Sequence, residues 1–235
     1  MRKSFDNFTI EYTEMDLVYI DDLIYKLLIS HEEIMNFFHL KKLDKKVYIK
    51  IWSNYKNYKT FVENEVQRLF HKSITLSDWN IGNAIATETE KQIHLLTYTE
   101  ILKRKSHHNY SIENMLTLCL HEFVHICDNQ FKHQQTTLTW FNEALATVLS
   151  KQFPKDFLNL NCTLEEFLNG HVDYVKYYTL GRYLFENYKS EDILKLAKNN
   201  QLLQEKTPFL FQEAKQWLET ITKQRKIDEK NLNKI

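Results

Sequence analysis

Glycine and proline are scarce in this chain: three Gly and two Pro occur among 235 residues. Because these residues mark most tight turns and flexible linkers, their scarcity predicts a helix-rich fold without a Gly/Pro/Ser linker. No repeat or low-complexity tract is present either. With 43% hydrophobic and 14% aromatic residues, the chain can bury one core, so we expect a single domain over residues 1–235.

Cysteine is also rare, and its positions show no paired motif. Cys119, Cys127 and Cys162 are odd in number and form no Cys-x-x-Cys motif. Nothing in this pattern indicates a disulfide framework, and a reducing compartment is favoured.

Net charge and long apolar runs are missing as well. The formal net charge is zero, so no electrostatic footprint for nucleic acid exists. No run is apolar enough to span a membrane, and residues 1–11 lack a signal core. A cytoplasmic location is therefore expected, and a secreted protein is compatible only with a mature form that has lost its leader.

Hydrophobic periodicity predicts strands first and helices later. The expected strands are 8–13, 46–52, 81–87 and 92–97. The expected helices are 16–40, 58–70, 111–127, 139–150, 172–188 and 208–221. This order predicts an α+β fold, with a small mixed-sheet lobe over about 1–128 and a mainly helical lobe over about 129–235.

The segment His121-Glu122-Phe123-Val124-His125 carries the most specific chemical pattern. On a helix, residues i and i+4 share one face, so both imidazoles can bind one ion. Glu122 is turned by about 100° from His121, which allows its carboxylate to meet a metal-bound water. The pattern predicts two zinc ligands and a general base.

A third ligand is expected downstream, because a catalytic zinc usually has three protein ligands and one open position. Glu143 lies in the helix-like run 139–150, beside small alanines that allow close helix packing. Together, His-Glu-x-x-His and Trp140-x-x-Glu143-x-x-Ala146 resemble the gluzincin zinc peptidases of the peptidase MA-like type, in both aminopeptidase-like and thermolysin-like branches. The resemblance implies a zincin-like fold with an active-site cleft between the lobes. It also implies one zinc ion held by His121, His125 and Glu143, with Glu122 as the base.

A tyrosine is expected to stabilise the oxyanion, because the relatives carry a Tyr-x-x-Gly pattern beyond the third ligand. Tyr178 and Gly181 match it, which makes Tyr178 the first candidate. Tyr174, Tyr177 and His171 remain alternatives. Each of these tyrosines could instead pack in the helix with its hydroxyl in water.

The strand at 81–87 is expected to bind the backbone of an extended peptide through its free edge. Asn83 and Ala84 resemble the Asn-Ala pair that opens this edge strand in thermolysin-like enzymes. The glutamate with which aminopeptidases hold a substrate's amino terminus is absent at the matching place. The sequence therefore favours an endopeptidase that acts on peptide or protein substrates.

Two other functions remain open. The chain could be a non-proteolytic zinc-binding regulator or interaction protein on the same fold, in which metal binding supports folding or partner contact. It could also be a helical interaction domain without metal. Metal analysis and peptide digestion with and without a chelator would separate the three.

Overall fold

The computed structural model describes residues 1–107, 109–133, 138–170 and 172–232. The chain divides into two compact units, Met1–Gln134 and Gln135–Ile235. Strands and helices both occur in the first unit, whereas the described part of the second is helical. The predicted mixed α+β composition is confirmed.

The first unit contains a mixed sheet in the order β1-β2-β3-β5-β4. Its strands are β1 (Arg2–Phe5), β2 (Phe8–Glu11), β3 (Val47–Trp52), β4 (Gly82–Ala86) and β5 (Lys91–Leu96). The three central strands are parallel to one another, and the two edge strands, β1 and β4, pair antiparallel. Strand β4 therefore lies at one edge of the sheet, next to β5.

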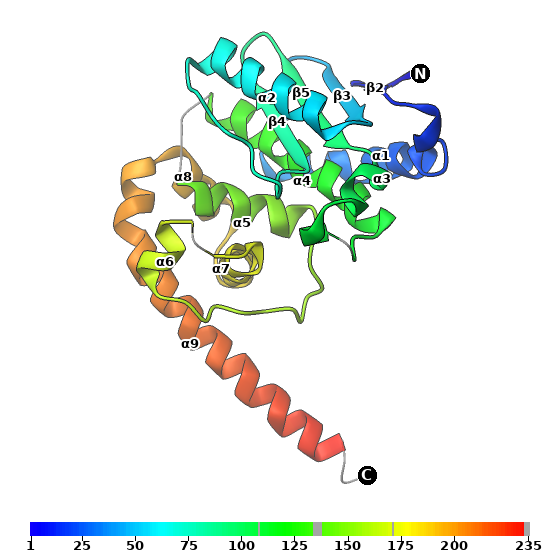
Figure 1. Cartoon of the computed structure of the whole chain (residues 1–235). Coiled ribbons are helices and arrows are strands. Elements are labelled where there is room, and N and C mark those ends of the chain that lie inside the picture. Colours follow the sequence, from blue (N-terminus) through cyan, green and yellow to red (C-terminus); the bar gives the residue numbers. More distant parts are fainter. Residues whose placement is uncertain (108, 134–137, 171, 233–235) are drawn as a thin grey trace. The chain divides into compact units, whose positions relative to one another are not determined.

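Helices cover both faces of this sheet (Figure 1). They are α1 (Ile20–Phe37), α2 (Tyr55–Phe70), α3 (Tyr98–Leu102) and α4 (Ile112–Lys132), with 3-10 turns at Glu14–Asp16 and Lys105–His107. On the face of α1 and α4, Phe8 meets Phe123 with ring centroids 5.3 Å apart. On the face of α2, Phe61 contacts His94 at 4.9 Å. The alternating burial of β3, with Val47 and its i+2 neighbours inside, follows from this arrangement.

The second unit contains α5 (Thr139–Leu149), α6 (Leu164–Leu168), α7 (Tyr174–Asn187), α8 (Ser190–Lys198) and α9 (Asn200–Leu232). Helices α5 and α7 pack closely because Gly181 has no side chain. A methyl group there would lie 2.8 Å from both the Ala144 carbonyl oxygen and Val148 Cγ2. The small residues that the sequence offered for tight helix packing are thus used within this unit.

Several details differ from the sequence-based expectations. Strand β1 was not expected, and α9 begins well before Pro208. The helical period of residues 16–40 predicts that Leu17 and Leu28 lie on its apolar face, but they are 48% and 42% exposed. A histidine outside any motif is expected at the surface or in a loop, but His31 and His94 are both buried. Among the described residues, no helix is long and apolar enough to cross a membrane.

Candidate metal centre

Helix α4 presents the His-Glu-x-x-His motif on a well-defined backbone. Ser111 caps its N-terminus by accepting a hydrogen bond from the Asn114 N–H at 3.1 Å. The helix runs without a break to Lys132, so the five residues of the motif occupy consecutive helical turns. The helix expected over residues 111–127 is therefore confirmed, and Ser111 is its N-cap.

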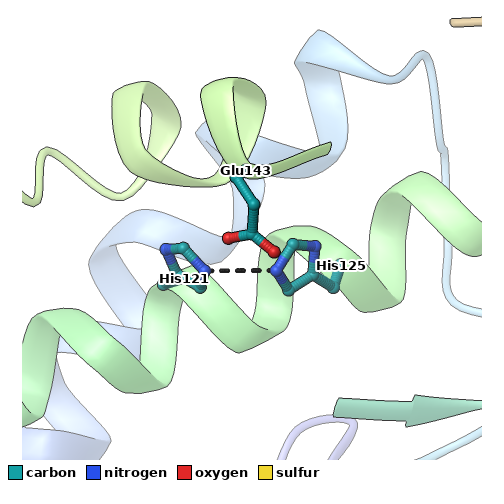
Figure 2. A group of neighbouring side chains, drawn as sticks. All are labelled: His121, His125 and Glu143. Carbon is teal, nitrogen blue, oxygen red and sulfur yellow. Dashed lines mark hydrogen bonds between the residues drawn. The ribbon is translucent and has the colours of Figure 1, made fainter. Parts of the chain in front are cut away.

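The two histidines lie one turn apart and point the same way (Figure 2). The Nε2 atoms of His121 and His125 are 3.1 Å apart, and the ring planes are nearly perpendicular at 82°. His121 is buried and His125 is half-buried. Both rings therefore offer the same nitrogen to a shared point.

Glu143 comes from α5, where buried Trp140, Phe141 and Ala144 fix the helix in its own unit. Its carboxylate points toward the paired imidazoles (Figure 2). The ligand atoms of His121, His125 and Glu143 all lie within 4.8 Å of one another.

The donor set and the nitrogen spacing fit a zinc ion. Two nitrogens bound at about 2.0–2.1 Å to a tetrahedral zinc lie about 3.3 Å apart. The observed separation of 3.1 Å between the two Nε2 atoms is close to that value. Two imidazoles and one carboxylate also leave a fourth position for a non-protein ligand. The three residues can hold zinc with small shifts of their side chains.

Glu122 lies on the side of α4 that faces β4, and it is only 6% exposed. A methyl group at Gly82 would be 3.0 Å from Glu122 Oε1 and 3.1 Å from the Leu118 side chain. The absence of a side chain at Gly82 therefore leaves room for the carboxylate. This role was missed in the sequence, although one of only three glycines opening a strand was a usable signal.

The negative charge of Glu122 affects the pKa of two buried residues, Tyr58 and Cys119, and of the half-buried Tyr110. Burial raises the pKa of the hydroxyls of Tyr58 and Tyr110 and of the Cys119 thiol, and the Glu122 charge raises each pKa further. The Tyr58 hydroxyl is buried and has no hydrogen-bond partner in the described part of the chain. The surroundings of Glu122 are thus poorly hydrated, which strengthens its interactions with any nearby charge.

Strand β4 lies at the sheet edge, as expected of a peptide-binding strand. Asn83 is opposite His94 and Ala84 is opposite Ile93 on β5. Because side chains alternate along a strand and Gly82 faces Glu122, the Asn83 side chain points to the other face. Its Oδ1 is buried without a hydrogen-bond partner among the described residues. Any contact of Asn83 with a peptide on the edge would therefore use its main chain.

The three candidate tyrosines of α7 differ in their surroundings. The Tyr178 hydroxyl donates to the Pro154 carbonyl at 3.3 Å and accepts from Arg182 at 3.4 Å. Burial raises the pKa of Tyr177, and the charge of Glu143 raises it further. Tyr174 is 47% exposed. His171 lies outside the described residues.

Comparison of the chain with protein-family models, with curated proteins and with solved structures gives no match.

Proposed function

We propose that this protein is a zinc-dependent metallopeptidase and, more specifically, an endopeptidase. The observation that carries the proposal is the convergence of His121, His125 and Glu143, whose ligand atoms lie within 4.8 Å of one another. The position of Glu122 beside the same histidines adds a base, which a purely structural zinc site does not need. The mixed sheet with β4 at its edge supports a zincin-like fold.

A zinc ion held by these three side chains can activate both water and the substrate. Bound by the three side chains, zinc supplies Lewis acidity that lowers the pKa of water toward neutrality and polarises a peptide carbonyl. Glu122 accepts the proton that the attacking water loses and then donates it to the departing amine. The buried setting of Glu122 keeps competing water away from this proton.

The substrate backbone would extend along the free edge of β4. Strand addition uses main-chain hydrogen bonds, so Asn83 and Ala84 contribute N–H and C=O groups whatever their side chains. Gly82 faces Glu122, which brings the bound peptide near the base. An extended internal segment of a peptide suits this edge, in agreement with endopeptidase action.

The proposed hydrogen-bond donor to the oxyanion is a tyrosine of α7. The Tyr178 hydroxyl bonds to the Pro154 carbonyl and to Arg182, so it would have to exchange these partners to reach an oxyanion. Tyr178 remains the first candidate because it matches the sequence pattern, and Tyr174 and Tyr177 remain the alternatives. Removing such a donor elsewhere costs about 2.7–4 kcal/mol of transition-state stabilisation.

The test is Glu122→Gln, which removes the base and keeps the size of the side chain. We expect one zinc per chain to remain while kcat falls by about 10²–10⁴-fold. Zinc content by atomic emission and cleavage of a peptide library by mass spectrometry give the two readouts. Glu113→Gln is the matched control, because Glu113 lies on the same helix with its side chain 70% exposed.

Three outcomes separate the possible functions. Zinc binding with cleavage that chelation and Glu122→Gln both abolish supports the peptidase. Stoichiometric zinc without any cleavage by the unaltered protein favours the regulatory or interaction role. A protein that binds no zinc, and whose stability does not respond to it, contradicts the whole assignment.

A further inference from the structure

Trp79 is a large apolar side chain in an unusual position. It is 69% exposed, in the connection between α2 and β4, three residues before Gly82. Single exposed aliphatic residues are common, but an indole held in water is typical of surfaces that bind a partner. An indole also adds a flat apolar face and one N–H donor.

The turn that carries this indole is firmly held. The Asn80 N–H donates to the Ser77 carbonyl at 3.0 Å, and the Ser77 N–H donates back to Asn80 Oδ1 at 2.9 Å. The Tyr55 hydroxyl donates to the Ser77 carbonyl at 2.9 Å, and Arg104 pairs with Asp78 at 3.3 Å. A side chain on such a braced turn loses little freedom when it binds a ligand.

The Trp79 indole is the first of three aromatic rings that contact one another in a row. Trp79 meets His107 edge-on with centroids 5.8 Å apart, and His107 meets Tyr110 edge-on at 5.4 Å. Trp79 itself lies three residues before Gly82, where a methyl group would stand 3.0 Å from Glu122 Oε1. The exposed indole and the two rings that it leads to therefore adjoin the start of β4, where Gly82 faces Glu122.

We propose that Trp79, His107 and Tyr110 form a subsite for an aromatic or large aliphatic side chain of the peptide bound along β4. The inference rests on the proposed peptidase function and names its substrate class. An extended strand rises about 3.3 Å per residue, so three residues span at most about 10 Å. The recognised side chain lies within about three positions of the cleaved bond.

A membrane surface is the other partner that an exposed indole could meet. The carboxylate of Asp78 adjoins Trp79 with its side chain 80% exposed, and burying that charge in a headgroup region is unfavourable. Continuity of the ring row with the sheet edge and with Glu122 favours the peptide instead.

The experiment compares two peptides that differ at one position, Phe in one and Ala in the other, with the full chain loaded with zinc. In Trp79→Ala we expect kcat/KM for the Phe peptide to fall by about tenfold or more, because burial of a large apolar side chain is lost. Cleavage of the Ala peptide should change less than twofold. Trp79→Phe should restore most of the preference, and Tyr25→Ala, which removes a 65% exposed aromatic residue from α1, should leave both rates unchanged.

A loss that is equal for both peptides, or no loss for either, overturns the subsite and leaves the peptidase standing. If the unaltered protein cleaves neither peptide, the peptidase fails, and calorimetric binding of the same two peptides decides the subsite separately. The subsite is supported if the Phe peptide binds more tightly than the Ala peptide and Trp79→Ala abolishes this difference. Equal binding of the two peptides, or Trp79-dependent binding to phosphatidylcholine vesicles alone, overturns it.

Discussion

At the scale of single residues, Gly82 controls where the Glu122 carboxylate can lie. The two residues come from different elements, β4 and α4, and approach so closely that a methyl group would stand 3.0 Å from Glu122 Oε1. A carboxylate can rotate away from such a group, but it then leaves its position beside the histidines. Gly82 is therefore a positioning residue in the proposed mechanism.

Gly82→Ala should lower kcat by about tenfold to a hundredfold, since small displacements of a catalytic group have effects of that size. KM and zinc content should remain nearly unchanged, because neither the edge of β4 nor the ligands are altered. Steady-state kinetics and metal analysis check both statements. An unchanged kcat, or a loss of zinc that accompanies the loss of activity, would contradict the positioning role.

At the scale of elements, the contact between α5 and α7 supports the position of Glu143. Gly181 of α7 lies against the main chain of α5 at Ala144, the residue that follows Glu143. A side chain at this point meets a carbonyl oxygen that cannot move without the helix. The packing of the two helices therefore determines where the third proposed ligand stands.

Gly181→Ala should destabilise the protein by up to about 2 kcal/mol. Overpacking of this kind costs about 1–3 kcal/mol, and the higher helix propensity of alanine returns at most about 1 kcal/mol. Urea unfolding of the zinc-free protein measures the difference without a contribution from the metal. If the variant has a higher free energy of unfolding than the wild type, the close contact between α5 and α7 is not needed for stability.

The elements that the sequence predicted are those that carry their own signals. Helix α4 combines an apolar stripe with a serine cap, and the strands β4 and β5 flank a short polar turn. Strand β1, in contrast, reads Arg-Lys-Ser-Phe and shows no alternation. It forms because a tight turn with Asp6 at φ 43° folds it back onto β2. Local pattern cannot reveal such a pairing.

The site residues also divide into those that the local sequence predicts and those that depend on distant neighbours. The motif on α4 and the downstream Glu143 were recognisable from residue type and spacing, and the structure brings them together. The hydrogen bond of the Tyr178 hydroxyl to the Pro154 carbonyl was not recognisable, because the two residues are 24 positions apart in the sequence. The roles of Gly82 and Trp79 likewise depend on neighbours that are distant in sequence.

At the scale of the whole molecule, the buried histidine His94 couples folding to pH. It accepts a hydrogen bond from the Trp52 indole N–H at 3.2 Å through Nδ1, so its Nε2 carries the proton and donates to Gln92 at 2.8 Å. Burial, aided by the charge of Lys50, lowers the pKa of His94 from 6.5 to about 4. The folded protein thus holds this ring neutral.

The sign of the effect follows from proton binding. Between pH 6.5 and 4 the unfolded chain protonates His94 and the folded chain does not, so acid favours unfolding. A shift of this size corresponds to about 3 kcal/mol of stability, present near neutral pH and lost as the pH falls to 4. Acid should therefore weaken the wild-type protein more than a variant without this ring.

His94→Asn tests this, because its amide oxygen can replace Nδ1 as the acceptor for Trp52 without binding a proton. Urea unfolding between pH 4 and 7 should show the stability difference between wild type and variant growing by about 3 kcal/mol toward neutral pH. His71→Asn, at the left-handed C-cap of α2 with φ 52°, controls for the loss of an exposed histidine. If the two variants differ from wild type by amounts that do not change with pH, His94 is not the group that links acid to unfolding.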